Sequence, residues 1–150
     1  MSGSKRPRLR VFLDSSVLIA GAMSSRGASY ALLRLAEVDL IDARISPEVR
    51  EETIRNLRAK APAALPFLNV LLSEAFPGVA EVPDEAIRAA AQSAHPKDVL
   101  ILAAATAQAC RYLVTLNERD FWPDSDLIQV IRPGEMIKVI REQVDRAGQA

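Results

Sequence analysis

Apolar and polar residues alternate along the chain in blocks that predict a regular succession of strands and helices. Short apolar runs bounded by turn residues predict buried strands at residues 9–13, 41–45, 79–82, 112–115 and 127–131. Between them, apolar residues three or four positions apart predict amphipathic helices. Helices are expected to open after Asp14 and at Pro47, to run through residues 30–35, 67–76, 84–94 and 95–110, and to span residues 133 to about 144.

This alternation of strands and helices predicts an α/β fold, a three-layer α/β/α sandwich around a central parallel sheet of about five strands. Residues 11–13 and 112–114 are almost wholly apolar, as in strands that are buried on both faces. A chain of 150 residues suits one domain. We place that domain at residues 9–147 and expect residues 1–8 (MSGSKRPR) to form a disordered basic arm.

Composition narrows the class of protein without naming a function. The 19 basic residues balance the 19 acidic ones, so any attraction to nucleic acid has to be local. No apolar run approaches the roughly 20 residues that span a bilayer, so we expect no membrane segment. The single cysteine, Cys110, makes no internal disulfide and lies after an apolar helical stretch, which indicates a core residue and a cytoplasmic protein.

Four acids stand at the edges of apolar segments: Asp14, Glu52, Asp98 and Asp120. Burying a carboxylate alone costs several kcal/mol, so acids beside apolar runs require an explanation. The carboxyl ends of parallel strands meet at one edge of a sheet, which is where such folds bind ligands. Acids that converge there would form a pocket of oxygen ligands for a hard divalent metal.

Each acid also has an ordinary structural explanation. Asp14 follows a strand and precedes Ser15, so a helix cap and a site fit it equally. Asp98 begins a helix that is apolar nearly all round, which places it near the core, although it could also be a cap. Glu52 shares the first turns of its helix with other glutamates, where the helix dipole favours negative charge. Asp120 lies in a polar loop, where an acid is usually solvated.

Four segments in order resemble the PIN-domain family of metal-dependent ribonucleases, over about residues 10–139. They are VFLDSSVL at 11–18, ISPEVREE at 45–52, PKDVLILAAA at 96–105 and LVTLNERDF at 113–121. The resemblance implies Asp14, Glu52, Asp98 and Asp120 as catalytic residues, with Mg²⁺ or Mn²⁺ bound by Asp14, Asp98 and Asp120. Glu52 fits the glutamate position best when Ser46 and Val49 are aligned, and Glu51 is the alternative.

One position departs from the pattern of many family members. They carry an aspartate two residues after the threonine, where this chain has Asn117. A branch of the family has asparagine there and keeps the acid three residues later, as in Asp120. Asn117 could ligate a metal through its amide oxygen or hold a metal-bound water. Ser15 and Thr115 are expected to hydrogen-bond the ligands or the substrate.

The resemblance implies an endonuclease for single-stranded RNA, in some members the VapC-type toxin of a toxin–antitoxin pair. An antitoxin protein and a homodimer are then candidate partners. Arg26, Lys97 and Arg119 are candidates for binding the RNA backbone. Trp122 could stack on a base, but packing beneath its loop is the interpretation favoured by sequence alone.

Two other functions remain open from the sequence. Asn117 is compatible with a catalytically weak or inactive PIN-fold domain that binds RNA or acts as a scaffold. An unrelated doubly wound domain that accepts a phosphoryl group on one aspartate is the third alternative. The lone His95 precedes Pro96 in a turn and is not expected to be a general base. The chain carries no Cys/His cluster for zinc and no glycine-rich phosphate loop.

Overall fold

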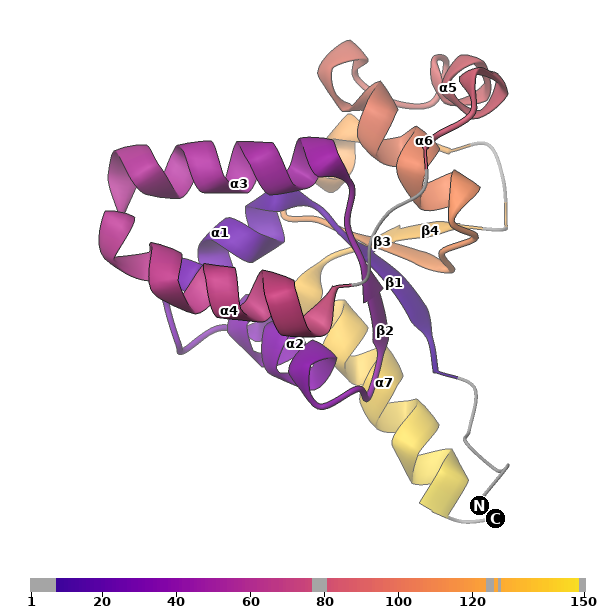
Figure 1. Ribbon diagram of the computed structural model, residues 1–150. Helices are drawn as coiled ribbons and strands as arrows, with labels where there is room; N and C mark the ends of the chain where they lie inside the picture. The colour runs from indigo at the N-terminus through magenta and orange to yellow at the C-terminus, as the bar shows by residue number, and fades with distance from the viewer. Residues whose placement is uncertain (1–7, 77–80, 124–125, 127, 149–150) are drawn as a thin grey trace.

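A computed structural model describes residues 8–76, 81–123, 126 and 128–148 of the protein (Figure 1). The strands are β1 (Arg10–Leu13), β2 (Asp42–Arg44), β3 (Tyr112–Val114) and β4 (Gln129–Ile131). The helices are α1 (Ser15–Met23), α2 (Ala28–Glu37), α3 (Pro47–Lys60), α4 (Leu65–Ala75), α5 (Asp84–Ala90), α6 (Val99–Ala107) and α7 (Pro133–Gly148). Short 3₁₀ turns are η1 (Pro62–Ala64), η2 (Pro96–Asp98) and η3 (Glu118–Asp120).

The four strands form one parallel sheet in the order β2-β1-β3-β4, which confirms the predicted α/β class. Val11 of β1 pairs with Ala43 on one side and with Tyr112 on the other. The expectation of about five strands was too high for the described part of the chain. Residues 79 and 80 of the expected extra strand lie outside the described residues, and Glu81 and Val82 are not in a strand.

Helices cover both faces of the sheet. Figure 1 shows α5 and α6 on one side and α1, α2 and α7 on the other, while α3 and α4 run side by side at one end. The central strand β1 is wholly buried from Val11 to Leu13. Full burial of each large apolar side chain contributes about 1.5–3 kcal/mol, so the sheet is the stable base from which the strand ends project.

α6 ends earlier than the apolar pattern predicts. Its last helical residue is Ala107, and Ala109 then adopts a left-handed conformation with φ 56°. The N–H of Cys110 donates to the carbonyl of Ala105, and the N–H of Ala109 donates to that of Thr106. These two bonds form the usual reversal at a helix end, here without the glycine that normally marks it. Cys110 is buried, as expected, and burial raises the pKa of its thiol to about 12.

The two ends of the domain differ slightly from the predicted boundaries. Residues 1–7 of the expected basic arm lie outside the described residues. Arg8 is exposed and pairs with Asp39 at 3.2 Å. At the other end α7 continues to Gly148, beyond the expected end near Val144. Within the described ranges, no helix is both long and apolar enough to cross a bilayer.

The close packing of α1 against α2 depends on Gly21. A Cβ atom at this residue would lie 2.5 Å from Cδ1 of buried Leu33 and 3.2 Å from the backbone carbonyl carbon of Ser29. α1 begins directly after β1, so its packing sets the direction in which the chain leaves the strand.

We expect Gly21→Ala to lower the free energy of unfolding by about 1 kcal/mol. The overpacking penalty of roughly 1–3 kcal/mol should exceed the gain in helix propensity of about 1 kcal/mol. Urea denaturation measures the difference. Gly134→Ala is the matched control, because nothing lies within 4 Å of a Cβ at that position. Equal stability changes for the two variants would contradict the packing argument.

Candidate active site

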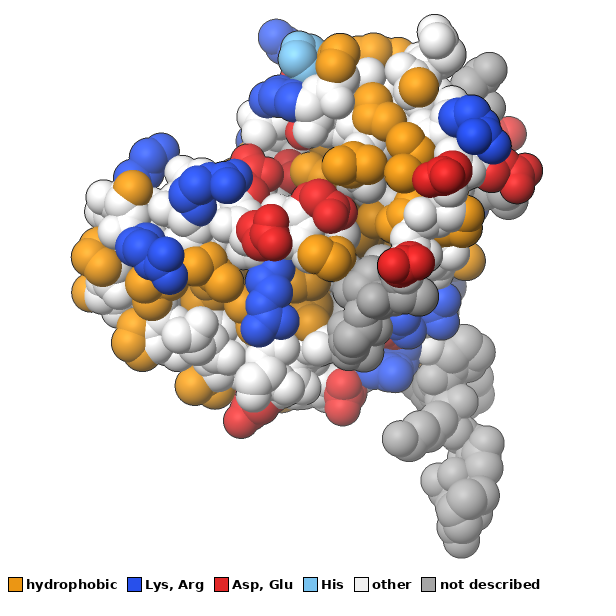
Figure 2. All heavy atoms as spheres, turned by 45° about the horizontal axis from the view of Figure 1, so that its top comes forward, with side chains coloured by type: hydrophobic (Ala, Val, Ile, Leu, Met, Phe, Trp, Pro, Cys, Tyr) orange, Lys and Arg blue, Asp and Glu red, His pale blue; other side chains and the backbone are white. Residues whose placement is uncertain are grey.

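The carboxyl ends of the strands bring together segments that are distant in sequence. Asp14 follows β1, and Thr115 follows the neighbouring strand β3. Ser46 follows β2 and caps α3, the helix that carries Glu52. Figure 2 shows Asp and Glu side chains gathered on this face, between the part that carries α3 and the part that carries α5 and α6.

Asp14 is both a helix cap and the centre of a hydrogen-bond network. Its Oδ1 accepts the backbone N–H of Ser15 at 2.9 Å, which caps α1. Its Oδ2 accepts the hydroxyls of Thr115 at 2.7 Å and Ser16 at 3.0 Å. The residue is only 5% exposed. These bonds satisfy the buried carboxylate and hold it in one orientation, so capping and a functional role do not exclude each other.

Ser16 is the residue that the sequence analysis missed. Its hydroxyl donates to Asp14 and accepts the backbone N–H of Leu116 at 3.0 Å, so it links the start of α1 to the chain after β3. Ser15 contributes its backbone N–H to Asp14, and its expected hydroxyl bond to a ligand is not among the contacts of the described residues. The Ser-Ser pair was visible in the sequence, but only the turn into α1 decides which hydroxyl faces the carboxylate.

Asp98 is the most perturbed acid of this edge. It immediately precedes α6, and its carboxylate makes no capping hydrogen bond, so the capping interpretation is wrong. Its side chain is 13% exposed, and Oδ2 is buried without a hydrogen-bond partner among the described residues. Burial raises its pKa to about 6; Lys97 opposes the shift, while Asp14, Asp120 and Glu52 add to it. The charges of the other three predicted acids therefore act on Asp98.

The choice between two neighbouring glutamates follows from the same geometry. Glu52 is partly buried and its charge acts on both Asp98 and Lys97. Glu51 is exposed. The face of α3 that packs inward carries Val49 and Thr53, which brings Glu52 toward the strand ends. The geometry therefore favours Glu52.

The ammonium group of Lys97 lies near two of the acids. Its ammonium nitrogen is 3.5 Å from Oδ2 of Asp120 and 3.9 Å from Oδ2 of Asp98. These acids, together with Glu52, raise the pKa of Lys97. The lysine is therefore a positive charge that partly offsets the mutual repulsion of the carboxylates.

A short antiparallel contact holds Asp120 against the start of η2. The backbone N–H of His95 donates to the carbonyl of Asp120 at 2.8 Å, and the N–H of Trp122 donates to the carbonyl of Ser93 at 2.7 Å. Ala94 and Phe121 form an isolated antiparallel bridge between these two bonds. We call residues 93–95 and 120–122 the brace. It fixes Asp120, the last residue of η3, near Lys97 and Asp98.

A protein-family model described as PIN domain matches residues 10–119. The chain belongs to the PIN-domain family. PIN domains are generally nucleases, so the acidic edge is the candidate active site of a nuclease. No curated protein matched the chain.

The match to the PIN domain covers three of the four acids and ends one residue before Asp120. Asn117 is exposed. Its backbone N–H donates to the Thr115 hydroxyl, and its carbonyl accepts the N–H of Asp120. Its backbone thus shapes the turn that leads to Asp120.

The acids of this PIN domain fit a divalent metal in their chemistry. They offer only oxygen donors, as Mg²⁺ and Mn²⁺ prefer, and the buried Oδ2 of Asp98 has no hydrogen-bond donor among the described residues. As the side chains stand, no three Asp, Glu, His or Cys residues in the described ranges are arranged to hold a metal. The nitrogen of Lys97 lies beside two of the expected donors, so it would have to move as a metal enters.

The residues predicted to contact RNA do not all lie at the acidic edge. Arg119 is exposed next to Asp120. Arg26 lies past the far end of α1, and this nine-residue helix separates it from Asp14 by about 13 Å along its axis. The structure therefore does not bring Arg26 to the acidic edge. Trp122 is 51% exposed, so the expectation that it packs beneath its loop is wrong, and buried Phe121 does so instead.

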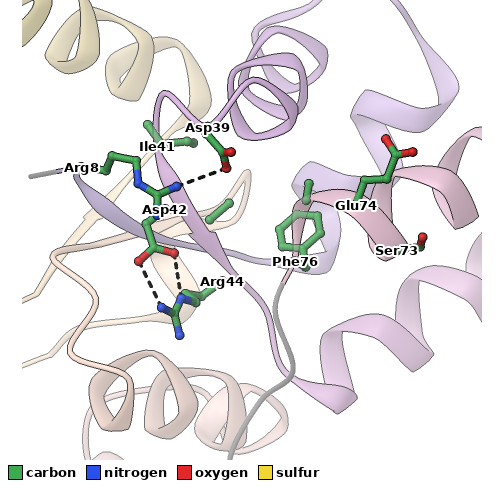
Figure 3. Close-up of a pocket in the computed structure, with 10 residues that line it drawn as sticks. Arg8, Asp39, Ile41, Asp42, Arg44, Ser73, Glu74 and Phe76 are labelled. Atoms are coloured by element: carbon green, nitrogen blue, oxygen red, sulfur yellow. Dashed lines mark hydrogen bonds and ion pairs between the residues drawn. The ribbon is translucent and has the colours of Figure 1, made fainter. Parts of the chain in front are cut away.

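A pocket of about 380 Å³ lies elsewhere, between β2 and the end of α4 (Figure 3). Four of its charged side chains are paired: Arg44 binds both oxygens of Asp42, and Arg8 binds Asp39. Burial alone would raise the pKa of Asp42, but hydrogen bonds from Arg44 and Arg10 bring it below its ordinary value. These hydrogen-bonded charges contrast with the Asp98 oxygen that lacks a hydrogen-bond donor among the described residues.

The raised pKa of Asp98 predicts a pH dependence of stability without metal. Between pH 4 and 6 the folded state binds more protons at Asp98 than the unfolded state, so wild-type stability falls as pH rises through this window. Asp98→Asn removes this loss. The quantity to measure is the melting temperature of the variant minus that of wild type. We expect this difference to be a few degrees larger at pH 7 than at pH 4, since about 1 kcal/mol corresponds to about 2–4 °C. A difference that stays constant between these pH values would contradict the shift.

Proposed function

We propose that this PIN domain is a metal-dependent endoribonuclease that cleaves single-stranded RNA. The observation that carries the proposal is the buried Oδ2 of Asp98, which has no hydrogen-bond donor among the described residues and only the ammonium of Lys97 at 3.9 Å, with Asp14, Asp120 and Glu52 in electrostatic range of it. A buried acid with so little compensation is costly, but a bound cation turns it into a favourable ligand. Asp14 and Asp98 would hold Mg²⁺ or Mn²⁺, with Asp120 as a third ligand and Glu52 in a direct or water-mediated role.

The bound metal would supply an activated water and neutralise the charge that develops on the phosphate. The chain's own residues prepare for this. Thr115 and Ser16 fix the orientation of Asp14, so a ligand is in place before the metal binds. The brace does the same for Asp120. Lys97, displaced from the acids by the metal, would lie within reach of a substrate phosphate oxygen.

Basic side chains around the acids support an RNA substrate. Lys97 and Arg119 flank the acidic edge, and both are exposed. Figure 2 shows further Lys and Arg side chains on the α3 side of this face. Exposed arginines of α3, which the sequence analysis did not single out, are Arg50, Arg55 and Arg58. With a formal net charge of zero, RNA binding has to depend on this local arrangement and to weaken as salt rises.

A second candidate is a PIN-fold domain that binds RNA without cleaving it. Asn117 and the absence of a preassembled metal cluster among the described residues favour it. Calorimetric titration separates the two. Heat from Mg²⁺ or Mn²⁺ binding to wild type that Asp98→Asn removes supports the enzyme, and no heat with wild type supports the binding domain.

We expect Asp14→Asn and Asp98→Asn each to reduce Mn²⁺-dependent cleavage of a single-stranded RNA to background. Each removes a negative charge and a ligand from the site. Cleavage of a labelled oligonucleotide measures the loss, and circular dichroism checks the fold. Glu51→Gln is the matched control, because this exposed acid on α3 should be dispensable while Glu52→Gln lowers activity. Wild-type rates in both aspartate variants would place the site elsewhere.

Thr115→Val tests whether the orientation of Asp14 matters. The substitution keeps the shape of the buried side chain and removes the 2.7 Å hydrogen bond. We expect metal affinity or the cleavage rate to fall about 10- to 100-fold, as is common when a residue that orients a metal ligand is removed. Metal titration and cleavage assays measure the effect. Unchanged values in a folded variant would show that the bonds from Ser15 and Ser16 hold Asp14 well enough.

The biological setting is a further part of the proposal. The resemblance to VapC-type members supports a cytoplasmic toxin with an antitoxin partner and a homodimeric state. A small antitoxin reading frame directly upstream of the gene would support the pairing. Size-exclusion chromatography with light scattering tests the dimer.

A further inference from the structure

Trp122 is an exposed tryptophan whose ring is nevertheless held in place. Half of the residue is accessible to solvent, at 51%. Its Nε1–H donates to the carbonyl of Gln92 at 2.9 Å, and its backbone N–H donates to the carbonyl of Ser93 at 2.7 Å. The hydrogen bond therefore restricts rotation of the indole, while much of the residue stays accessible to solvent.

The brace places this ring beside the candidate active site. Phe121 has an extended backbone, with φ −131° and ψ 131°, and its own side chain is buried. Trp122 is two residues after Asp120, so their Cα atoms are at most about 7 Å apart. The backbone bonds of the brace hold both residues, Asp120 through its carbonyl and Trp122 through its N–H.

The charges around the ring indicate what it binds. The ammonium of Lys97 lies 3.5 Å from the carboxylate of Asp120, and the exposed Arg119 directly precedes that acid in the chain. Positive side chains for the phosphate and an aromatic ring for the base are the combination with which proteins bind single-stranded nucleic acid. An acidic protein surface would be repelled by the four carboxylates nearby, whereas a nucleic acid can place its phosphate on the metal and its base on the ring.

We propose that Trp122 is the stacking platform for the base next to the scissile phosphate, and that it selects single-stranded RNA. This inference rests on the proposed ribonuclease function. A base in a duplex is already stacked and paired, so it gains little from the indole, whereas an unpaired base gains the full interaction. The preference for single strands would then come from this ring.

The chain contains one tryptophan, so Trp122 reports on its own contacts. The experiment uses full-length Asp14→Asn protein, which should bind without cleaving, and a mixed-sequence single-stranded RNA of about ten nucleotides. We expect saturable quenching of tryptophan fluorescence, and much weaker quenching by the same sequence as a duplex. Absence of quenching, or equal quenching by single strand and duplex, would overturn the proposal.

Variants measure the contribution of the ring. In the Asp14→Asn background, we expect Trp122→Ala to weaken RNA binding roughly 5- to 100-fold by fluorescence anisotropy of labelled RNA, in line with the usual contribution of base stacking. Trp122→Phe should retain most of the affinity. Val144→Ala, at a residue of α7 that is equally exposed, is the control and should bind as its parent does. A phenylalanine variant as weak as the alanine variant would contradict stacking and point to the Gln92 hydrogen bond.

Cleavage assays distinguish the stacking role of Trp122 from the proposed ribonuclease function on which it rests. With Asp14 intact, we expect Trp122→Ala to raise KM while most of kcat remains. Quenching by RNA in a protein that cleaves nothing would support the platform and reject the ribonuclease. Metal-dependent cleavage with an unchanged KM in Trp122→Ala would support the ribonuclease and reject the platform.

Discussion

The hydrogen bond from Thr115 to Asp14 is the contact on which the rest of the site depends. It joins the ends of β1 and β3, which are neighbours in the sheet but about a hundred residues apart in sequence. Because the parallel sheet is buried on both faces, its strand ends hold their positions, and polar side chains that follow them share one edge. Ser16 and the backbone of Leu116 close the network. A carboxylate bound in this way can be buried without a cation and still be ready to bind one.

The other acids are held by different means, and this difference explains their electrostatics. Asp98 is buried at the start of an apolar helix and has no donor for one oxygen, so its pKa rises and it depends on an external charge. Asp120 is held by backbone bonds in the brace, and Lys97 supplies a positive charge between the two. The site thus balances like-charge repulsion against the ammonium of Lys97. A divalent ion would take over this role and displace Lys97 from the acids.

The apolar blocks were enough to predict the strand-helix alternation, because the central strands β1 and β3 are buried and therefore almost wholly apolar. Asp14 and Asp98 could be singled out for the same reason, as acids beside segments that must be buried. The end of α6 could not be predicted, since the left-handed turn at Ala109 lacks the glycine that usually signals it. The exposure of Trp122 was also missed, because its anchoring carbonyl belongs to Gln92, thirty residues earlier.

The sequence by itself determined the class of fold, the order of its elements and the kinds of side chain that follow the strands. These are local properties, set by the period of apolar residues and by the cost of burying charge. Only the tertiary structure decided which side chains meet: Ser16 instead of Ser15 at Asp14, Glu52 instead of Glu51 toward Asp98, and Arg26 away from the acidic edge. Such choices depend on the rotation of each helix about its axis and on contacts between distant segments, and neither is encoded in a single window of sequence.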